Sequence, residues 1–233
     1  MTLVTLRNMI APTLLGTANI PNNGGELRLT QRENDFSIRL KGVGGELMNS
    51  RVHGSELALA ELGCAHVQGK ENTKVLVGGM GMGFTLAAAL KATSKSSSVV
   101  VAELVPEVIE WNKGPLGECA GRPLDDARVQ VHLGDVAELF ETKQATYDAV
   151  LLDVDNGPES FTQADNNKLY TIESLQAIKQ TLRPGGMLAV WSAWHDAKFT
   201  VQLKKAGFNV EAKTVRAHNG KGSRHTIYLA KKK

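Results

Sequence analysis

The sequence predicts an α/β protein built on a mostly parallel, doubly wound sheet. From residue 74 onward, short apolar runs alternate with stretches of helical period, as repeated β-α units require. Two of these runs, residues 147–152 and 187–191, are almost continuously apolar, which is typical of strands covered on both faces. A glycine-rich turn follows the first run, at the position where such sheets bind ligands.

Composition and length agree with a folded, single-chain globular protein. The chain has 233 residues, of which 42% are hydrophobic and 22% charged, and this does not support a disordered or collagen-like chain. No uninterrupted apolar run of about 18 residues occurs, so a membrane-spanning helix is not expected. Residues 9–20 make a poor signal peptide, and two cysteines, Cys64 and Cys119, are too few for a disulfide framework. We therefore expect a cytoplasmic protein.

The first 50 residues are expected to form a small β element that precedes the main domain over residues 51–233. Residues 26–30 and 36–41 alternate apolar and polar side chains around a polar turn, which predicts a hairpin. The next element is a helix over residues 55–65, with Ser55 as its candidate N-cap.

The main sheet is expected to take its strands from a series of apolar runs. These are residues 74–77, 98–102, 128–132, 147–152 and 187–191. Two later runs, residues 207–213 and 225–230, flank an Asn-Gly step that suits a tight turn, so we expect an antiparallel hairpin at the end of the chain.

The turn after the first main-sheet strand carries glycines at positions 79, 81 and 83. Glycines here let a ligand lie directly on the backbone near a helix N-terminus. The spacing does not match the Gly-x-Gly-x-x-Gly fingerprint of pyrophosphate-containing dinucleotides. Gly79, Gly81 and Gly83 are therefore predicted to hold a nucleoside without a pyrophosphate; the alternative is a turn that is glycine-rich only for close packing.

Two acidic residues follow the next two strands. Glu103 ends the second strand, where a carboxylate can accept hydrogen bonds from both hydroxyls of a ribose. Asp135 follows the third strand and could accept a hydrogen bond from an exocyclic amine such as that of adenine. An N-cap of the helix expected after Asp135 is an equally good interpretation, and both can hold.

The reacting centre is expected after the fourth strand, at Asp153 and Asp155. They emerge at the carboxyl edge of the sheet, where the ligand crevice lies, and a Gly-Pro turn follows them. A metal site is not expected, because no further ligand has a suitable spacing. After the fifth strand, Trp191 is interpreted as core, while Trp194 and His195 are left open between pocket and structural roles.

The ordered motifs of this chain, from about residue 47 to residue 230, resemble those of the spermidine synthase branch of the class I S-adenosylmethionine-dependent transferases. The motifs are Thr85-Leu86 after the glycines, Glu103 with Pro106-Glu107-Val108-Ile109, Asp125-Asp126-Ala127-Arg128-Val129 before Gly134-Asp135, Tyr147-Asp148-Ala149-Val150-Leu151-Leu152-Asp153, Gly157-Pro158, Leu169-Tyr170-Thr171, and Leu182-Arg183-Pro184-Gly185-Gly186.

The resemblance implies a Rossmann-like class I methyltransferase fold and a transferase that uses an S-adenosyl sulfonium donor. The donor would be S-adenosylmethionine or its decarboxylated form, and the acceptor a small amine. Asp153 and Asp155 would then be catalytic, and Tyr170 and Trp194 would contact the acceptor. Among the departures from the family pattern, Met82 stands where the family has the aspartate that, by the resemblance, holds the donor's amine.

Two other functions compete with aminopropyl transfer. The first is a methyltransferase that uses intact S-adenosylmethionine. The second is a non-catalytic protein that binds a nucleoside or nucleic acid through Arg216, Lys221 and Arg224. The net charge of +3 and the lysines at the C-terminus are better explained by a solvated tail, so nucleic acid is not the expected partner. The resemblance also suggests a homodimer.

Overall fold

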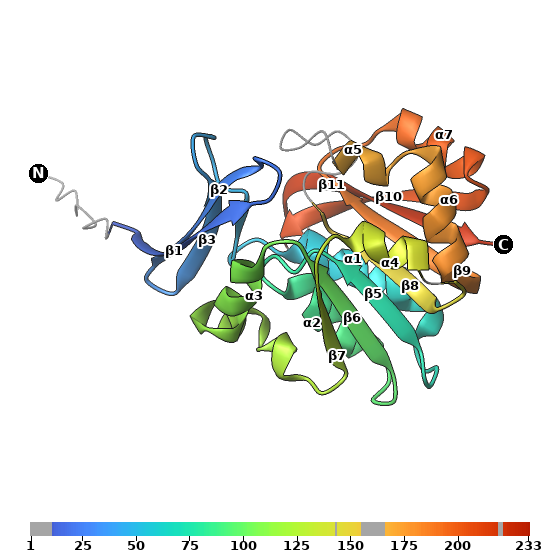
Figure 1. Cartoon of the computed structure of the whole chain (residues 1–233), viewed down its shortest axis with the longest axis horizontal. Coiled ribbons are helices and arrows are strands. Elements are labelled where there is room, and N and C mark those ends of the chain that lie inside the picture. The colour runs from blue at the N-terminus through green and yellow to red at the C-terminus, as the bar shows by residue number, and fades with distance from the viewer. Residues whose placement is uncertain (1–10, 143, 155–165, 219–220) are drawn as a thin grey trace, which may run out of the picture.

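The computed structural model describes residues 11–142, 144–154, 166–218 and 221–233 (Figure 1). These residues form a small antiparallel sheet near the N-terminus and a larger mixed sheet that carries the helices. This architecture confirms the predicted α/β class with a mostly parallel sheet. None of the helices in the described part of the chain has the length and apolar character that crossing a bilayer requires.

The N-terminal sheet has the order β1-β2-β3-β4, and each neighbouring pair is antiparallel. Its strands are β1 (Thr13–Ile20), β2 (Gly25–Arg32), β3 (Asp35–Leu40) and β4 (Met48–Asn49). The predicted hairpin is confirmed as β2 and β3. Strand β1 was not predicted, because this edge strand buries little more than Ala18.

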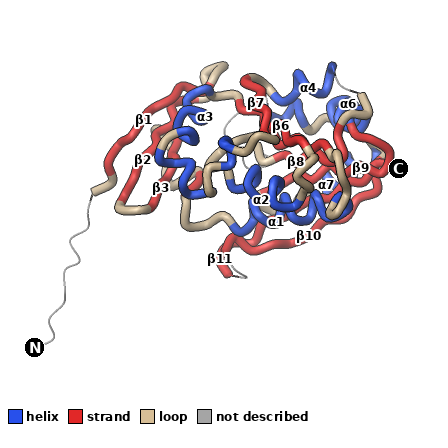
Figure 2. The backbone as a smooth tube through the Cα atoms, turned by 90° about the horizontal axis from the view of Figure 1, so that it is seen from below, coloured by secondary structure: helices blue, strands red, loops and turns tan. Residues whose placement is uncertain are grey.

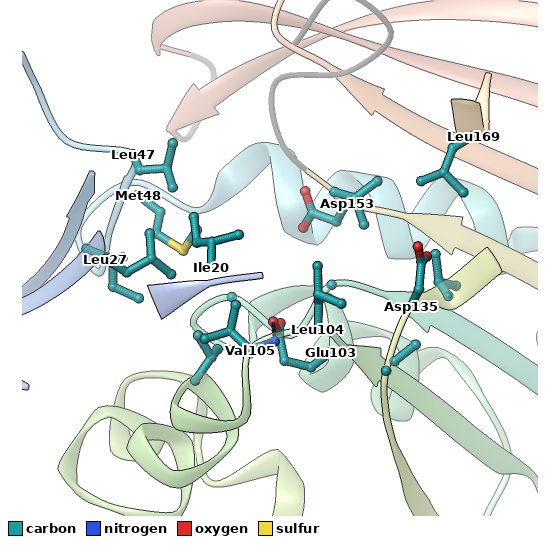
Figure 3. Close-up of a pocket in the computed structure, with 18 of the residues that line it drawn as sticks. Ile20, Leu27, Leu47, Met48, Glu103, Leu104, Val105, Asp135, Asp153 and Leu169 are labelled. Atoms are coloured by element: carbon teal, nitrogen blue, oxygen red, sulfur yellow. Dashed lines mark hydrogen bonds between the residues drawn. The ribbon is translucent and has the colours of Figure 1, made fainter. Parts of the chain in front are cut away.

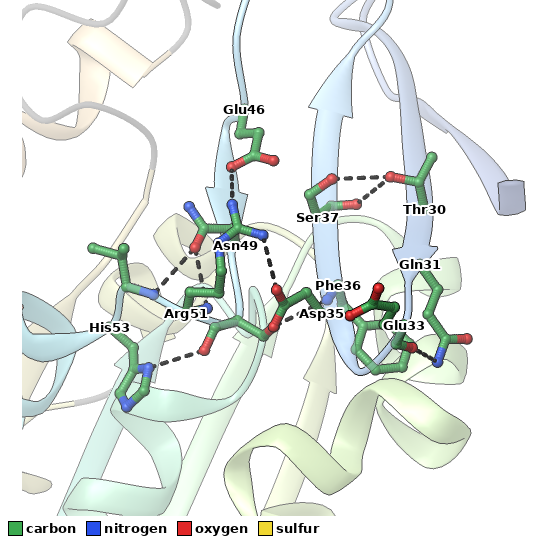
Figure 4. A network of polar contacts seen from close by, with 12 residues as sticks. Thr30, Gln31, Glu33, Asp35, Phe36, Ser37, Glu46, Asn49, Arg51 and His53 are labelled. Atoms are coloured by element: carbon green, nitrogen blue, oxygen red, sulfur yellow. Dashed lines mark hydrogen bonds and ion pairs between the residues drawn. The ribbon is translucent and has the colours of Figure 1, made fainter. Parts of the chain in front are cut away.

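A polar network fixes the segment between the small sheet and the first helix (Figure 4). Arg51 pairs with Glu46 at 3.0 Å and with Asp35 at 3.4 Å, so it joins this segment to β3. Asn49 Oδ1 accepts hydrogen bonds from the backbone N–H groups of Arg51 and Val52, both at 3.1 Å. The path of residues 46–53 is therefore held at both ends.

Helix α1 (Gly54–Cys64) follows, and its N-cap differs from the prediction. The N-cap position is His53, without a side-chain capping bond, and Ser55 is already helical. The Ser55 hydroxyl instead donates to Glu56 Oε2 at 2.6 Å. The prediction of Ser55 as the N-cap was therefore wrong by two residues, since Gly54 begins the helix.

The larger sheet has the strand order β10-β11-β9-β8-β5-β6-β7. Its strands are β5 (Lys74–Gly78), β6 (Ser98–Glu103), β7 (Val129–Leu133), β8 (Tyr147–Leu152), β9 (Leu182–Ser192), β10 (Phe208–His218) and β11 (Lys221–Lys232). Strands β5 to β9 pair in parallel, whereas β10 and β11 form the predicted antiparallel hairpin. The chain order reverses between β5 and β8, which is where sheets of this kind bind ligands.

Helices cover the larger sheet on both faces (Figure 2). They are α2 (Phe84–Ala92), α3 (Pro106–Lys113), α4 (Val136–Thr142), α5 (Asn166–Leu169), α6 (Ile172–Thr181) and α7 (Ala197–Lys205), with short 3₁₀ turns η1 (Ala65–Val67), η2 (Pro115–Ala120) and η3 (Pro123–Asp125). One buried cluster joins α1, α2 and α3 to the sheet and continues into the small sheet, and a second joins α4, α6 and α7 to the other face. Burial on both faces explains why the strands could be predicted as apolar runs.

Candidate functional site

The glycine turn between β5 and α2 has the conformation that only glycine adopts readily. Gly79, Gly81 and Gly83 have φ angles of 91°, 49° and 85°, and Gly83 is the N-cap of α2. A Cβ atom on Gly79 would lie 2.4 Å from the carbonyl oxygen of Asp153. The turn can therefore pass directly over the end of β8, and this close approach explains why glycine is needed at position 79.

Glu103, at the end of β6, ties two loops together. Its Oε2 accepts the backbone N–H of Met80 and its Oε1 accepts that of Val105, both at 2.9 Å. Burial raises the pKa of this carboxyl, and the bonds from Val105 and Met80 partly oppose the rise. A carboxylate has about four lone-pair sites, so Glu103 can accept hydroxyl groups in addition to these two backbone bonds.

Asp135 takes the capping position that was one of its two predicted roles. Its Oδ1 accepts the backbone N–H of Ala137 at 2.9 Å, at the start of α4. The side chain is exposed, and it also lines a cavity beside Glu103. Capping uses one oxygen, which leaves the other available to a ligand.

The first cavity has a volume of about 410 Å³ and lies between the two sheets. On one side it is lined by the Gly79 turn, Glu103, Asp135 and Asp153. The opposite wall is apolar and comes from the small sheet and the segment after it: Ile20, Leu27, Ile38, Leu40, Leu47 and Met48. Figure 3 shows Glu103, Asp135 and Asp153 around the cavity, with this apolar wall facing them. Such a mixture of apolar walls and a few polar groups is typical of small-molecule sites.

Asp153 follows β8 and faces the same cavity. Its Oδ2 accepts the hydroxyl of Thr85 at 2.6 Å. Burial and the nearby charge of Glu56 raise the pKa of Asp153 to about 7, and the bond from Thr85 opposes the rise. A carboxyl with this pKa can both take up and release a proton near neutral pH, as a general base must.

A second cavity, of about 360 Å³, lies on the α1 and α2 side of the sheet edge. Its lining includes Glu56 and Thr85 from the helices, and Trp191 and His225 from the sheet. Four residues line both cavities: Leu47, Met48, Gly81 and Asp153. The two cavities therefore meet at Asp153.

Trp191 packs against the core, as predicted, and it also lines this second cavity. The register pairs Leu152 with Val190, so the next residues, Asp153 and Trp191, lie side by side at the strand ends. The Trp191 ring packs on His225 with centroids 4.8 Å apart. In the described part of the chain, Trp191 Nε1 and His225 Nδ1 are buried without a hydrogen-bond partner. Burial lowers the pKa of His225, so its ring is a neutral wall of the cavity.

Met82, where the related family has an aspartate, is 4% exposed and packs in the core cluster shared by α1 and α2. The same side chain lines the second cavity. Met82 therefore packs in the core, and its uncharged thioether also lines the second cavity, where an aspartate would place a negative charge.

Three of the remaining candidate residues, Tyr170, Trp194 and His195, are not among the described residues that line either cavity. Tyr170 is 3% exposed and packs edge-on against Phe199 at 5.3 Å, so the structure places it in the core. Trp194 is 36% exposed and is not among the lining residues. His195 is exposed and stacks on Tyr228. Asp155 lies outside the described residues.

Sequence reasoning missed Glu56, Thr85 and His225. Thr85 is next to the glycine turn, and a hydroxyl in the first turn of a helix could have been considered as a partner for a strand-end acid. Glu56 and His225 lie far from that turn in the sequence, and only the folded topology brings them to Asp153.

Comparison with known proteins agrees with this geometry. The family model described as "Spermine/spermidine synthase domain" matches residues 58–215. A polyamine aminopropyltransferase of Prochlorococcus marinus is 32% identical over 123 residues, covering 52% of this chain and 41% of the relative. A polyamine aminopropyltransferase of Oceanobacillus iheyensis is 30% identical over 170 residues, covering 71% of this chain and 31% of the relative. The chain thus spans less than half the length of these curated relatives.

Solved structures show the same fold. A spermidine synthase in complex with the transition state analogue AdoDATO has a TM-score of 0.72 and 17% identity, covering 94% of this chain and 72% of that one. A probable spermidine synthase from Corynebacterium glutamicum has a TM-score of 0.63 and 15% identity, covering 95% of this chain and 80% of that one.

Proposed function

Because this chain belongs to the spermine/spermidine synthase domain family, we propose that it transfers an aminopropyl group from decarboxylated S-adenosylmethionine to a small amine. The observation that carries the proposal is the meeting of two cavities at Asp153. The first has the glycines and acids that suit a nucleoside, and the second opens on the other side of the same carboxylate. A donor and an acceptor held in these cavities would meet at one point.

The proposed donor site is the first cavity. Glu103 would accept the ribose hydroxyls through its free lone pairs, and Asp135 would accept the exocyclic amine of adenine through its free oxygen. The turn over Gly79 and Gly81 would let the nucleoside approach the backbone. The apolar wall from Ile20 to Met48 would cover the opposite side of the nucleoside.

The proposed reaction needs alignment and one proton acceptor. The lone pair of a neutral amine attacks the carbon bound to the sulfonium sulfur, a C–N bond forms, and the C–S bond breaks with its electrons going to sulfur. The amine is neutral because its ammonium form has first given one proton to Asp153, and the nitrogen of the product keeps its other two protons and the positive charge. Because a sulfonium is already a strong electrophile, positioning supplies much of the rate. Asp155, predicted from the sequence to assist, stays a proposal.

The by-product distinguishes aminopropyl transfer from methyl transfer. The protein would be incubated with 1,4-diaminobutane and either decarboxylated or intact S-adenosylmethionine, and the products identified by mass spectrometry. Aminopropyl transfer leaves methylthioadenosine, whereas methyl transfer leaves S-adenosylhomocysteine. Formation of methylthioadenosine together with an aminopropylated amine supports the proposal, and S-adenosylhomocysteine with a methylated product would replace it.

The role of Glu103 gives a first prediction. Glu103→Gln should weaken binding of methylthioadenosine by about tenfold to a hundredfold, since hydrogen bonds to a charged group are worth roughly 1.5 to 3 kcal/mol. The variant should also unfold more easily, because one oxygen that accepts a backbone N–H is replaced by a donor. Calorimetry measures the affinity and the unfolding temperature. Glu107→Gln, at an exposed position of α3, is the matched control, and equal affinity in a folded Glu103→Gln protein would contradict the assignment.

Three further proposals concern the N-terminal region, the cellular location and the oligomeric state of the protein. We propose that the N-terminal region, predicted as residues 1–50, is a distinct β unit, and its described strands contribute one wall of the donor cavity. The two cysteines, Cys64 and Cys119, are unpaired, which supports a reducing cytoplasmic location. A homodimer is proposed from the family resemblance, and size measurement in solution would test it.

A further inference from the structure

Glu56, in the first turn of α1, is a second carboxylate of the cavity that we propose for the acceptor. It is half-buried and lines this cavity together with Asp153 and Thr85. Ser55 donates a hydrogen bond to Glu56 Oε2 at 2.6 Å, just as Thr85 donates to Asp153 Oδ2 at 2.6 Å. Each of the two carboxylates thus accepts one hydrogen bond from a hydroxyl group, Glu56 from Ser55 and Asp153 from Thr85.

Neither carboxylate has a cationic partner among the residues that the structure describes. The contrast is with Glu46, which lines the same cavity but pairs with Arg39 at 3.2 Å and Arg51 at 3.0 Å. Glu56 and Asp153 are therefore two like charges that share a cavity without neutralisation. Burial raises the pKa of Glu56, and the bond from Ser55 opposes the rise.

Several other titratable groups line the two cavities with Asp153, and each can be considered in turn for its influence on the ionisation of this carboxyl. The titratable residues that line the two cavities with it are Glu46, Glu56, Glu103, Asp135, Glu138 and His225. Glu46 is neutralised by its arginines, and His225 has its pKa lowered by burial. Glu138 pairs with His132 at 3.2 Å, on the side of the first cavity. After the larger effect of burial, the charge of Glu56 raises the pKa of Asp153.

We propose that Glu56 is the positioning residue for proton transfer, because its charge across the acceptor cavity makes Asp153 the group that takes the proton from the acceptor amine. This inference rests on the proposed function. At neutral pH a primary amine is mostly an ammonium ion and cannot attack a carbon atom. Two carboxylates that line one cavity attract the ammonium, and their mutual repulsion favours transfer of one of its protons to Asp153. The nitrogen then has the free lone pair that the C–N bond needs, and the proton stays on Asp153 until the product leaves.

The test compares Glu56→Gln with Glu61→Gln, an exposed position on the same helix. The first readout needs no substrate: the carboxyl carbon of Asp153 is followed by ¹³C NMR as pH changes, with Asp153→Asn used to assign the signal. In Glu56→Gln the midpoint should fall by about one pH unit or more, because a like charge has been removed. Glu61→Gln should titrate like the wild type.

The second readout is the pH dependence of turnover with decarboxylated S-adenosylmethionine and 1,4-diaminobutane. The acid limb of the profile should move to lower pH in Glu56→Gln by the same amount as the NMR midpoint, and the maximal rate should fall by about tenfold or more, within the range for a weakened general base. If Glu56 had only a structural role, Glu56→Gln would lower the maximal rate without shifting the acid limb of the pH–rate profile. An unchanged NMR midpoint would overturn the inference.

Two further outcomes distinguish failure of the role of Glu56 from failure of the proposed aminopropyl transfer. If Glu56→Gln does not fold, Ser55→Ala replaces it: loss of the hydroxyl makes the Glu56 charge less favourable, so the Asp153 midpoint should fall in the same direction by a smaller amount, and no fall would count against the inference. If the wild type forms no aminopropylated amine, the proposed function fails and the inference fails with it. Normal turnover with an unmoved midpoint refutes the role of Glu56 alone.

Discussion

Asp153→Asn is expected to lower kcat by roughly a hundredfold or more, with little change in the affinity for the donor nucleoside. Asparagine keeps the size of the side chain and an oxygen that can accept the Thr85 hydroxyl, but it cannot take a proton. Loss of a general base costs about a hundredfold to ten-thousandfold. Single-turnover rates and calorimetry with methylthioadenosine separate the two effects.

The same variant should be more stable than the wild type above neutral pH. The pKa of Asp153 is about 7 in the folded protein against an ordinary 3.8, so between these pH values the folded state binds more protons than the unfolded state. The free energy of unfolding of the wild type therefore falls as pH rises through this window. Asparagine does not titrate and so has no such penalty. The free energy of unfolding of Asp153→Asn should therefore exceed that of the wild type by on the order of 2 to 4 kcal/mol at pH 8, and the two should be equal below about pH 4.

Asp125→Asn, at an exposed position in η3, is the control for both measurements. Denaturant unfolding at pH 4, 6 and 8 measures the stabilities. Equal rates in the wild type and in Asp153→Asn would show that the proton acceptor lies elsewhere. A stability difference that does not change with pH would show that Asp153 is not held at a raised pKa.

The main sheet could be predicted because its strands are buried on both faces. Residues 147–152 form an apolar run that ends where the strand ends, and β8 has these same bounds. Strand β1 could not be predicted in this way, since its exposed pattern leaves no alternation to detect. Strand β9 begins at Leu182, earlier than residue 187, because Leu182 already pairs with Tyr147, before a register shift that precedes the pairing of Met187 with Ala149.

The donor side of the site could be predicted because its residues follow successive strands in chain order. Gly79, Glu103 and Asp135 each come directly after a strand, and parallel strands bring their carboxyl ends to one edge. The residues that line the acceptor cavity come from the start of α1, the glycine turn, the end of β9 and the start of β11, which lie far apart in the sequence. Trp191 resembles a core residue in the sequence, and only the register beside Asp153 shows that it reaches the cavity.

Met82→Asp is expected to create a preference for decarboxylated S-adenosylmethionine that the wild type lacks or has only weakly. An aspartate attracts the ammonium of the decarboxylated donor and disfavours the carboxylate of the intact molecule, whereas the thioether of Met82 does neither. A charge-assisted contact is worth roughly 1.5 to 3 kcal/mol. The affinity ratio of the two donors should therefore change by about tenfold to a hundredfold in favour of the decarboxylated one.

Met82→Asn is the matched control for this change, because it has the same size as aspartate without its charge. Met82 is 4% exposed and packs in the core, so both variants should lose stability by a similar amount. Any difference in donor preference between them then comes from the charge. The measurement is calorimetric binding of intact and decarboxylated S-adenosylmethionine to the wild type and both variants. Strong selectivity of the wild type for the decarboxylated donor would contradict the prediction.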